Sequence, residues 1–135
     1  MRIIGGKYKG LKLLPPDGCK IRPTSDRLKE SLFSIISSNK YMINIESCNV
    51  LDICSGTGSL GIESFSRGAV SVYFIDKDHR SINLIYKNIA KLNIDSKLEN
   101  KIKVIKNEAT KALKNINKIF HIVLIDPPYN TNITE

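Results

Sequence analysis

From residue 49 onward, apolar positions occur in short β-branched runs that alternate with longer amphipathic stretches. This alternation is typical of βαβ units on a parallel sheet. The runs predict strands at Val50–Ile53, Val70–Ile75, Ile102–Ile105 and Ile119–Ile125. The stretches between them predict helices at Ser59–Arg67, Asp78–Leu92 and Ala109–Asn115, the second of which would turn Ile82, Ile85 and Ile89 inward. We therefore expect an α/β fold with flanking helices on a mainly parallel sheet.

The first forty residues follow a different pattern. Residues 2–14 place short apolar runs around a glycine-rich, basic segment, which predicts a small β-hairpin. A turn over Pro15–Gly18 follows. Arg22-Pro-Thr-Ser-Asp26 then supplies a proline stop and N-cap candidates for a helix that runs to about Ser38. In that helix Leu28, Leu32, Ile35 and Ile36 fall on one face.

The length of 135 residues and the 41% hydrophobic content allow one modest core, so residues 1–135 are expected to form a single domain. Residues 1–40 would be an extension and residues 48–135 the core. The chain has neither a long apolar stretch nor the order of a signal peptide, which favours a soluble protein of the cytoplasm. The odd number and the spacing of Cys19, Cys48 and Cys54 predict reduced thiols, and we expect no metal site.

The formal charge of +8 is concentrated near the N-terminus. Residues 1–40 contain nine basic and three acidic residues, a net charge of +6, which leaves +2 for the rest. A basic surface can dock a polyanion, because neutralising phosphates releases counterions. A solvated, lysine-rich surface is the alternative, and charge alone does not decide between them. The residues predicted to contact the polyanion are Lys7, Lys9, Lys12, Arg22 and Arg27.

A glycine-rich segment, Asp52-Ile-Cys-Ser-Gly-Thr-Gly-Ser59, lies where the first strand of the sheet should lead into a helix. Glycines at such a turn let a ligand approach the backbone closely. Gly56 to Gly61 also match the dinucleotide pattern, so the pattern alone does not separate NAD from S-adenosylmethionine. The Asp52 carboxylate favours the cationic amino end of a methionine over a pyrophosphate. A tight turn without a ligand is the plain alternative.

Two further acidic residues follow the next two strands. Asp76 lies about 20 residues after the glycines, a distance expected for a residue that binds a ribose diol. Asp78 is assigned to the cap of the following helix, although either residue could be a cap. Glu108 is placed to reach the adenine end of the same cofactor or to occupy a helix first turn. The predicted cofactor-binding residues are Asp52, Ser55, Gly56, Thr57, Gly58, Asp76 and Glu108.

The most specific segment is Asp126-Pro127-Pro128-Tyr129, at the end of the fourth strand. An exocyclic amino group on a base is a poor nucleophile, because its lone pair is delocalised into the ring. The Asp126 side chain and the Pro127 carbonyl could each accept an N–H hydrogen and favour the tetrahedral amine of a methyl-transfer transition state. The prolines would fix these acceptors, and Tyr129 offers a stacking face for a base. A proline turn that ends a strand without chemistry is the alternative.

These residues resemble the amino-group methyltransferases whose fourth motif reads Asp or Asn, Pro, Pro, then Tyr or Phe. More closely, the chain resembles the bacterial small-subunit ribosomal RNA guanine-N2 methyltransferase family. Its members begin with stretches similar to Met1-Arg-Ile-Ile-Gly-Gly-Lys-Tyr-Lys-Gly10 and Arg22-Pro-Thr-Ser-Asp-Arg-Leu-Lys-Glu-Ser-Leu-Phe33, followed by the glycine segment and Asp126–Tyr129. The resemblance covers the whole chain through four motifs in order.

The resemblance implies a Rossmann-like class I methyltransferase that transfers a methyl group from S-adenosylmethionine to N2 of one guanine in 16S ribosomal RNA. The substrate would be the small ribosomal subunit or its assembly intermediate, and we expect a monomer. The cofactor's methionine end is assigned to Asp52, Gly56 and Gly58, its ribose to Asp76 and its adenine to Glu108, where the family usually has Asp. Family members continue beyond the Asp-Pro-Pro-Tyr motif, so C-terminal strands are expected to be missing here. The resemblance then implies a sheet of strand order 3-2-1-4 whose fourth strand is an edge.

Three alternatives remain open from the sequence. A DNA adenine-N6 methyltransferase needs the same amine acceptors, and only the basic opening segment favours RNA. An NAD-dependent oxidoreductase is disfavoured by Asp52 and by the Asp126–Tyr129 motif. A truncated chain that binds cofactor or nucleic acid without turnover is the third.

Overall fold

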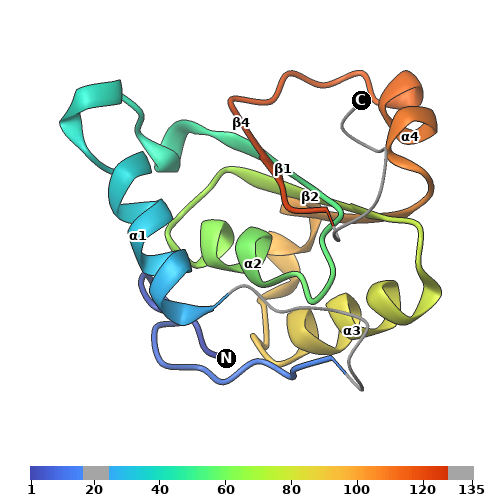
Figure 1. Ribbon diagram of the computed structural model, residues 1–135, viewed down its shortest axis with the longest axis horizontal. Coiled ribbons are helices and arrows are strands. Elements are labelled where there is room, and N and C mark those ends of the chain that lie inside the picture. The colour runs from blue at the N-terminus through green and yellow to red at the C-terminus, as the bar shows by residue number, and fades with distance from the viewer. Residues whose placement is uncertain (17–24, 128–135) are drawn as a thin grey trace.

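The computed structural model describes residues 1–16 and 25–127. Its centre is a four-stranded parallel sheet of order β3-β2-β1-β4 (Figure 1). The strands are β1 (Asn49–Ile53), β2 (Ser71–Asp76), β3 (Ile102–Lys106) and β4 (Ile122–Ile125). The α-helices are α1 (Asp26–Ile36), α2 (Ser59–Ser66), α3 (His79–Ala90) and α4 (Ala109–Asn115). Short 3-10 helices are η1 (Asn39–Tyr41), η2 (Ile45–Ser47) and η3 (Ser96–Lys101). The predicted strand order and α/β fold are confirmed.

The sheet separates two hydrophobic cores. Helices α2 and α3 pack on one face, where Val72, Phe74 and Ile85 are fully buried, and α1 with the N-terminal segment extends this core through Phe33. On the other face α4 covers the sheet, over Leu51, Ile53 and Ile75. The inward orientation predicted for Ile82, Ile85 and Ile89 is confirmed, since the first two are buried and the third packs against the core.

Two predicted strands begin later than the sequence suggested. Strand β2 begins at Ser71, because Val70 is 43% exposed outside the ladder, and β4 begins at Ile122 rather than at Ile119, which is 79% exposed. Both residues are β-branched and read as strand from local preference, but they lie outside the sheet pairing. The predicted helices agree with the observed α2, α3 and α4 to within two residues at each end.

The N-terminal hairpin is present in reduced form. Residues 1–3 and 10–13 run antiparallel with one β-bridge, between Arg2 and Lys12, and with backbone bonds such as Ile3 N–H to Leu11 O at 2.9 Å. Helix α1 begins as expected, with the Ser25 hydroxyl accepting from Leu28 N–H. Only part of the apolar face predicted for this helix packs against the core.

Helix α1 buries Lys29 and Phe33 instead of Leu28 and Ile35, which are 60% and 54% exposed. Leu32 and Ile36 lie at the border of the core. The reason is that Lys29 finds buried partners: its ammonium donates to Arg2 O at 2.6 Å and to Ser59 Oγ at 2.8 Å. A charge satisfied in this way turns the helix away from its most apolar face.

Candidate functional site

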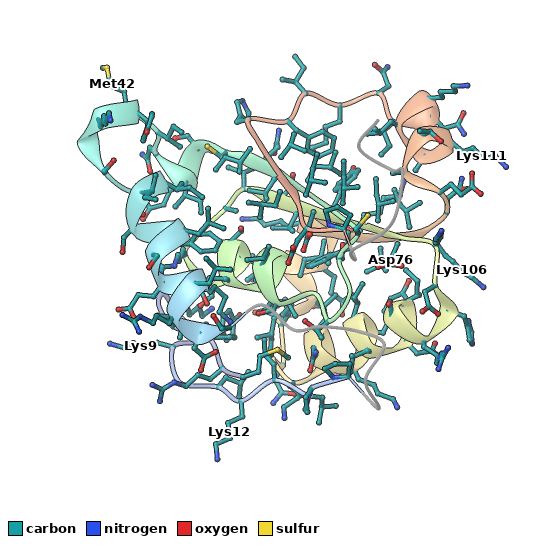
Figure 2. The ribbon with its side chains drawn as sticks, viewed as in Figure 1. Lys9, Lys12, Met42, Asp76, Lys106 and Lys111 are labelled. Atoms are coloured by element: carbon teal, nitrogen blue, oxygen red, sulfur yellow. The ribbon has the colours of Figure 1, made fainter. Side chains whose placement is uncertain are left out.

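All four strands are parallel, so their carboxyl ends lie along one edge of the sheet. This edge carries the acidic and glycine-rich residues that the sequence predicted. Asp52 is the fourth residue of β1, Asp76 is the last residue of β2, and Asp126 directly follows β4. Figure 2 shows Asp76 at this edge, beside Lys106, its register partner at the end of β3. Three carboxylates from three adjacent strands are therefore brought together.

The glycine segment forms a compact loop between β1 and α2. Left-handed backbone angles occur at every second residue: Cys54 (φ 59), Gly56 (φ 57) and Gly58 (φ 80). Ser55 and Thr57 are buried, and their hydroxyls are used inside the loop. Ser55 Oγ donates to Asp52 O at 2.6 Å, and Thr57 Oγ1 accepts from Ser59 N–H at 3.3 Å. These two hydroxyls shape the loop, so a ligand would meet its backbone.

Asp52 lies beneath this loop with 1% of its surface exposed. Its Oδ2 accepts from Gly61 N–H at 2.9 Å in the first turn of α2. A carboxylate at a helix N-terminus is normally stabilised by the helix dipole. Burial outweighs that effect here and, with a smaller contribution from nearby Asp126 and Asp76, raises the pKa of Asp52 to about 7. The side chain is thus poised between its neutral and charged forms near neutral pH.

Gly61 allows helix α2 to lie directly on the sheet. A Cβ at this position would lie 2.3 Å from the Phe74 ring and 3.0 Å from Asp52 Oδ2. A close approach of helix and strand is the role expected for the third glycine of such a loop. The contact also places the Gly61 amide within reach of Asp52.

Asp76 fastens the loop to the neighbouring strand. Its Oδ2 accepts from Gly56 N–H and its Oδ1 accepts from Asp78 N–H, both at 2.9 Å. Asp78 caps α3 as predicted, accepting from Arg80 N–H at 2.9 Å. Asp76 is half-buried, and each of its oxygens retains a further lone pair for a ligand hydroxyl.

Glu108 lies just beyond β3, at the N-cap position of α4. Its side chain is exposed, makes no capping bond and lies 3.9 Å from the Lys111 ammonium. The preceding residue, Asn107, donates its backbone N–H to Asp76 O at 3.0 Å, which holds this turn beside the acidic edge. Glu108 is therefore near the edge but does not point into a buried position.

Asp126 is exposed and Pro127 is half-buried at the end of β4. Asp126 lies close enough to Asp52 to raise its pKa. Pro128 and Tyr129, predicted to complete the catalytic motif, lie outside the described residues. Asp126, and in part Pro127, are accessible to solvent at the same edge as the glycine loop.

The electrostatics of this edge favour a cationic ligand. A positive charge near Asp52, Asp76 and Asp126 would relieve their mutual repulsion and lower the pKa of Asp52, whereas the pyrophosphate of a dinucleotide would add to the repulsion. S-adenosylmethionine carries both an ammonium and a sulfonium group. The donor set and the glycine loop therefore fit this cofactor better than NAD.

Of the basic residues predicted to dock a polyanion, Lys9 and Lys12 lie away from Asp76 in Figure 2. Lys7, Lys9 and Lys12 are exposed on the N-terminal hairpin, and Figure 2 shows the last two projecting from the opposite side of the molecule to Lys111. Arg27 is exposed in the first turn of α1, where Asp26 pairs with Arg2 at 3.8 Å. Arg22 lies outside the described residues.

Sequence reasoning missed a buried residue that supports the site. Asn88 of α3 is fully buried; its Nδ2 donates to Thr57 O in the glycine loop at 2.9 Å and to Leu14 O at 3.2 Å. Its Oδ1 accepts from Leu14 N–H at 2.7 Å. The signal was a polar residue one helical turn after Ile85, on the face that the pattern turned inward. Asn88 joins the N-terminal segment to the loop.

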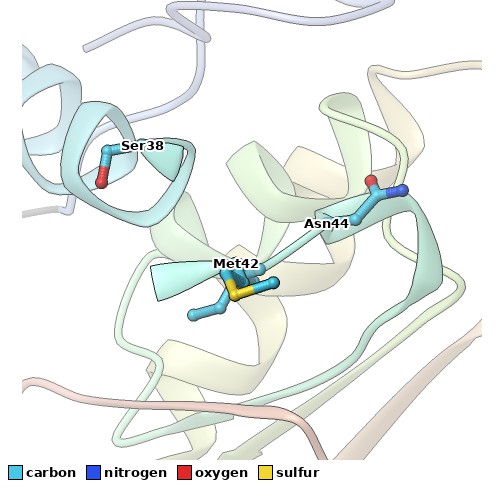
Figure 3. Close-up of a pocket in the computed structure, with 4 residues that line it drawn as sticks. Ser38, Met42 and Asn44 are labelled. Carbon is cyan, nitrogen blue, oxygen red and sulfur yellow. The ribbon is translucent and has the colours of Figure 1, made fainter. Parts of the chain in front are cut away.

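A surface hollow lined by Ser38, Met42, Ile43 and Asn44 lies beyond the end of α1 (Figure 3). In Figure 2 Met42 and Asp76 are well separated, so this hollow is not part of the acidic edge.

Across residues 1–16 and 25–127, no group of three or more His, Cys, Asp or Glu side chains could hold a metal ion. No helix in the same part of the chain has the length and apolar character needed to cross a membrane.

Curated proteins that are similar to this chain include proteins named as ribosomal RNA methyltransferases. It is 33% identical to ribosomal RNA small subunit methyltransferase D of Escherichia coli K12 over 135 residues, which is 100% of this chain and 63% of that protein. It is 35% identical to the protein of the same name from Buchnera aphidicola of Baizongia pistaciae, over 98% of this chain and 63% of the relative. The chain thus spans less than two thirds of the length of these relatives.

Solved structures agree with the fold. The Escherichia coli protein yhhF matches 96% of this chain and 65% of its own, with a TM-score of 0.77 and 32% identity. A hypothetical protein of Thermus thermophilus, TTHA0928, matches 98% of this chain and 71% of its own, with a TM-score of 0.80 and 24% identity. The fold is that of the Rossmann-like class I methyltransferases. Since residues 1–135 match the family described as conserved hypothetical protein 95, the chain belongs to that family.

Proposed function

We propose that the protein is an S-adenosylmethionine-dependent methyltransferase that acts on N2 of a guanine in 16S ribosomal RNA. The observation that carries the proposal is the position of Asp126 and Pro127, which directly follow β4 at the same edge as the glycine loop and buried Asp52. The names of the relatives, ribosomal RNA small subunit methyltransferases, support RNA as the substrate class. The substrate would be the small ribosomal subunit or its assembly intermediate.

The cofactor would be held along the acidic edge. The charged form of Asp52 and the backbone of the glycine loop would receive its methionine end, Asp76 its ribose hydroxyls, and Glu108 its adenine. When bound, the cofactor supplies an electrophilic methyl group. Asp52 would then remain ionised near pH 7, because a cationic neighbour lowers the pKa that burial has raised.

The amine acceptors follow from the position of β4. The Asp126 carboxylate and the Pro127 carbonyl can each accept one hydrogen from an amino group presented at this edge. Two such acceptors favour the tetrahedral amine over the planar one, so the lone pair of the nitrogen becomes available. The fixed φ of Pro127 limits the reorganisation needed. Pro128 is proposed to help fix the two acceptors in place, and Tyr129 is proposed to stack on the base.

The RNA would dock on the N-terminal hairpin. Lys7, Lys9 and Lys12 are exposed there, and Arg27 is exposed nearby at the start of α1. Backbone bonds and the buried Glu63 hold the hairpin to α2: Lys7 N–H donates to Ser66 O at 2.8 Å, and Gly5 N–H donates to Glu63 at 2.9 Å. A docking surface fixed to the helix of the cofactor loop would hold RNA in a defined position relative to the methyl donor. Arg22 is proposed to belong to the same surface.

The decisive experiment measures methyl transfer from labelled S-adenosylmethionine to small ribosomal particles that lack the modification, followed by mapping of the modified base. Label on N2 of a single guanine is the expected result. Duplex DNA in a parallel reaction tests the adenine-N6 alternative, which label in DNA but not in RNA would support. Calorimetric titration with NAD tests the oxidoreductase alternative. Cofactor binding without transfer to either nucleic acid would contradict the proposed activity.

A further inference from the structure

The positive charge outside the N-terminal region is not spread evenly. Residues 97–118 contain seven lysines and two glutamates, a net charge of +5, whereas residues 41–96 carry five basic and six acidic residues. The chain therefore has a second basic region that the total charge conceals. The seven lysines are Lys97, Lys101, Lys103, Lys106, Lys111, Lys114 and Lys118.

Four of these lysines belong to the face of the sheet that α4 covers. Lys103 is in register with Tyr73 on β2, and Tyr73 belongs to the core beneath α4. Lys111 and Lys114 lie on the exposed side of α4, whose Ala109 and Ala112 face the sheet. Lys118 comes from the segment between α4 and β4. We call Lys103, Lys111, Lys114 and Lys118 the α4-face lysines.

Two of the α4-face lysines converge on one aromatic ring. The Lys103 and Lys118 ammonium nitrogens lie 5.8 Å and 5.2 Å from the centre of the Tyr73 ring, which also contacts Phe120 edge-to-face at 5.3 Å. Each cation is attracted to the ring, but the two cations repel one another. An anion between them would remove that repulsion.

The acidic residues within the described chain compensate this face poorly. The ion pair that α4 makes there joins Lys111 to Glu108 at 3.9 Å, and both side chains are more than half exposed. Such a pair contributes little free energy in water. The α4-face lysines are exposed, so they present much of their charge to solvent.

We propose that the α4-face lysines form a second contact surface for the phosphate backbone of RNA, separate from the N-terminal hairpin. The proposal rests on the proposed function. Lysines from β3, α4 and a connecting segment suit an extended polyanion such as RNA. Its phosphates repeat along the chain, and lysines can bind them whatever the base sequence is. In Figure 2 Asp76 lies between Lys9 and Lys12 on one side and Lys111 on the other. RNA held at both surfaces would cross the acidic edge where the methyl group is transferred.

The test compares two double variants of the full chain. Lys103→Gln with Lys118→Gln removes the converging pair, and Lys40→Gln with Lys87→Gln removes two exposed lysines elsewhere, one of which also lies over a tyrosine ring, 5.5 Å from Tyr41. Binding to an unmodified transcript of small-subunit ribosomal RNA is measured at several salt concentrations. For the first variant, the slope of the logarithm of the RNA-binding constant against the logarithm of the salt concentration should become shallower by about 0.7–0.9 for each lysine removed. The second variant should have the slope of the unaltered protein.

Thermal unfolding and S-adenosylmethionine affinity of both variants establish that the fold and the cofactor site are intact. An unchanged salt dependence in the folded Lys103/Lys118 variant would overturn the proposal, as would equal losses in both variants. The proposal would also be overturned if the Lys103/Lys118 variant bound purified small-subunit proteins more weakly but bound the RNA as well as the unaltered protein does, because the partner would then be a protein. RNA binding with this salt dependence but without methyl transfer by the unaltered chain would contradict the proposed function and leave the RNA surface supported.

Discussion

The Lys29 ammonium lies 3.7 Å from Glu63 Oε1, and both side chains are completely excluded from solvent. Glu63 also accepts from the backbone N–H groups of Ile4 and Gly5 at 2.9 Å and from Arg67 Nε at 2.8 Å. Burial lowers the pKa of Lys29, and the Glu63 carboxylate opposes that shift. One carboxylate thus joins the N-terminal hairpin, α1 and α2.

Replacing Glu63 should therefore destabilise the protein strongly. Glu63→Ala leaves the Lys29 charge buried and two hairpin amides without an acceptor, which should lower the free energy of unfolding by about 3–5 kcal/mol in urea titrations. Glu63→Gln keeps an acceptor oxygen and should lose less. As a control, Glu99→Ala on the exposed η3 should change stability by no more than about 0.5 kcal/mol. Similar effects at the two positions would show that the buried pair is unimportant.

Asp52 should make stability depend on pH. Its pKa is raised from 3.8 to about 7 in the folded protein, so the folded state binds the proton more tightly than the unfolded chain does. The free energy of unfolding should therefore fall as pH rises from about 4 to 7 and level off above 7, by at most about 4 kcal/mol. Urea titrations at intervals of pH measure this slope. Asp52→Asn should remove it, whereas Glu99→Gln should not.

The same Asp52→Asn variant should have opposite effects on stability and on cofactor binding. Above pH 7 it should be more stable than the unaltered protein without cofactor, because no charge is buried. It should bind S-adenosylmethionine more weakly, because the anionic partner of the methionine amine is gone. A variant that gains stability but keeps its cofactor affinity would contradict the assignment of Asp52.

Asp76 and Asp78 offer a matched pair two residues apart. Asp76→Ala should weaken S-adenosylmethionine binding by about 1–3 kcal/mol in calorimetry, since it removes a charged acceptor for the ribose and frees the Gly56 amide. Asp78→Ala removes the cap of α3 and should cost about 1 kcal/mol of stability with little change in affinity. Equal losses of affinity in the two variants would reduce Asp76 to a structural role.

Asp126 should matter for rate rather than for cofactor affinity. Asp126→Ala removes one acceptor for the target amine and should lower the rate of methyl transfer by roughly 10²–10³-fold at saturating cofactor. Single-turnover kinetics with labelled cofactor measure the rate, and calorimetry measures the affinity. A parallel loss of cofactor affinity would place Asp126 with Asp52 and Asp76 instead.

Much of the fold was predictable because its signals are local. Strand β1, the capped start of α3 and the glycine loop each combine a hydrophobic period with a turn or cap residue, and all three appear where expected. The strand order was implied by the family resemblance, because helical crossovers between parallel strands do not by themselves select one order, and the sheet has that order. The acidic edge was predictable because parallel strands must align their carboxyl ends.

The failures all depend on partners distant in sequence. Leu28 and Ile35 were assigned to one apolar face, but Lys29 is buried in their place because Glu63, 34 positions later, and Ser59 satisfy its charge. Asn88 was overlooked for the same reason, since its partners Leu14 and Thr57 come from two other parts of the chain. A periodic pattern contains no information about which polar group a buried polar residue will find.

Gly61 has a consequence for how this protein can vary. The gap between α2 and the sheet is set by a hydrogen atom, since a methyl group there would overlap the Phe74 ring. Any larger side chain must displace either the Phe74 ring or the first turn of α2, and this turn both follows the glycine loop and donates to Asp52. The size of the side chain at position 61 therefore affects the shape of the binding loop. Substitutions at position 61 should be tolerated less well than substitutions at the solvent-facing residues of the site.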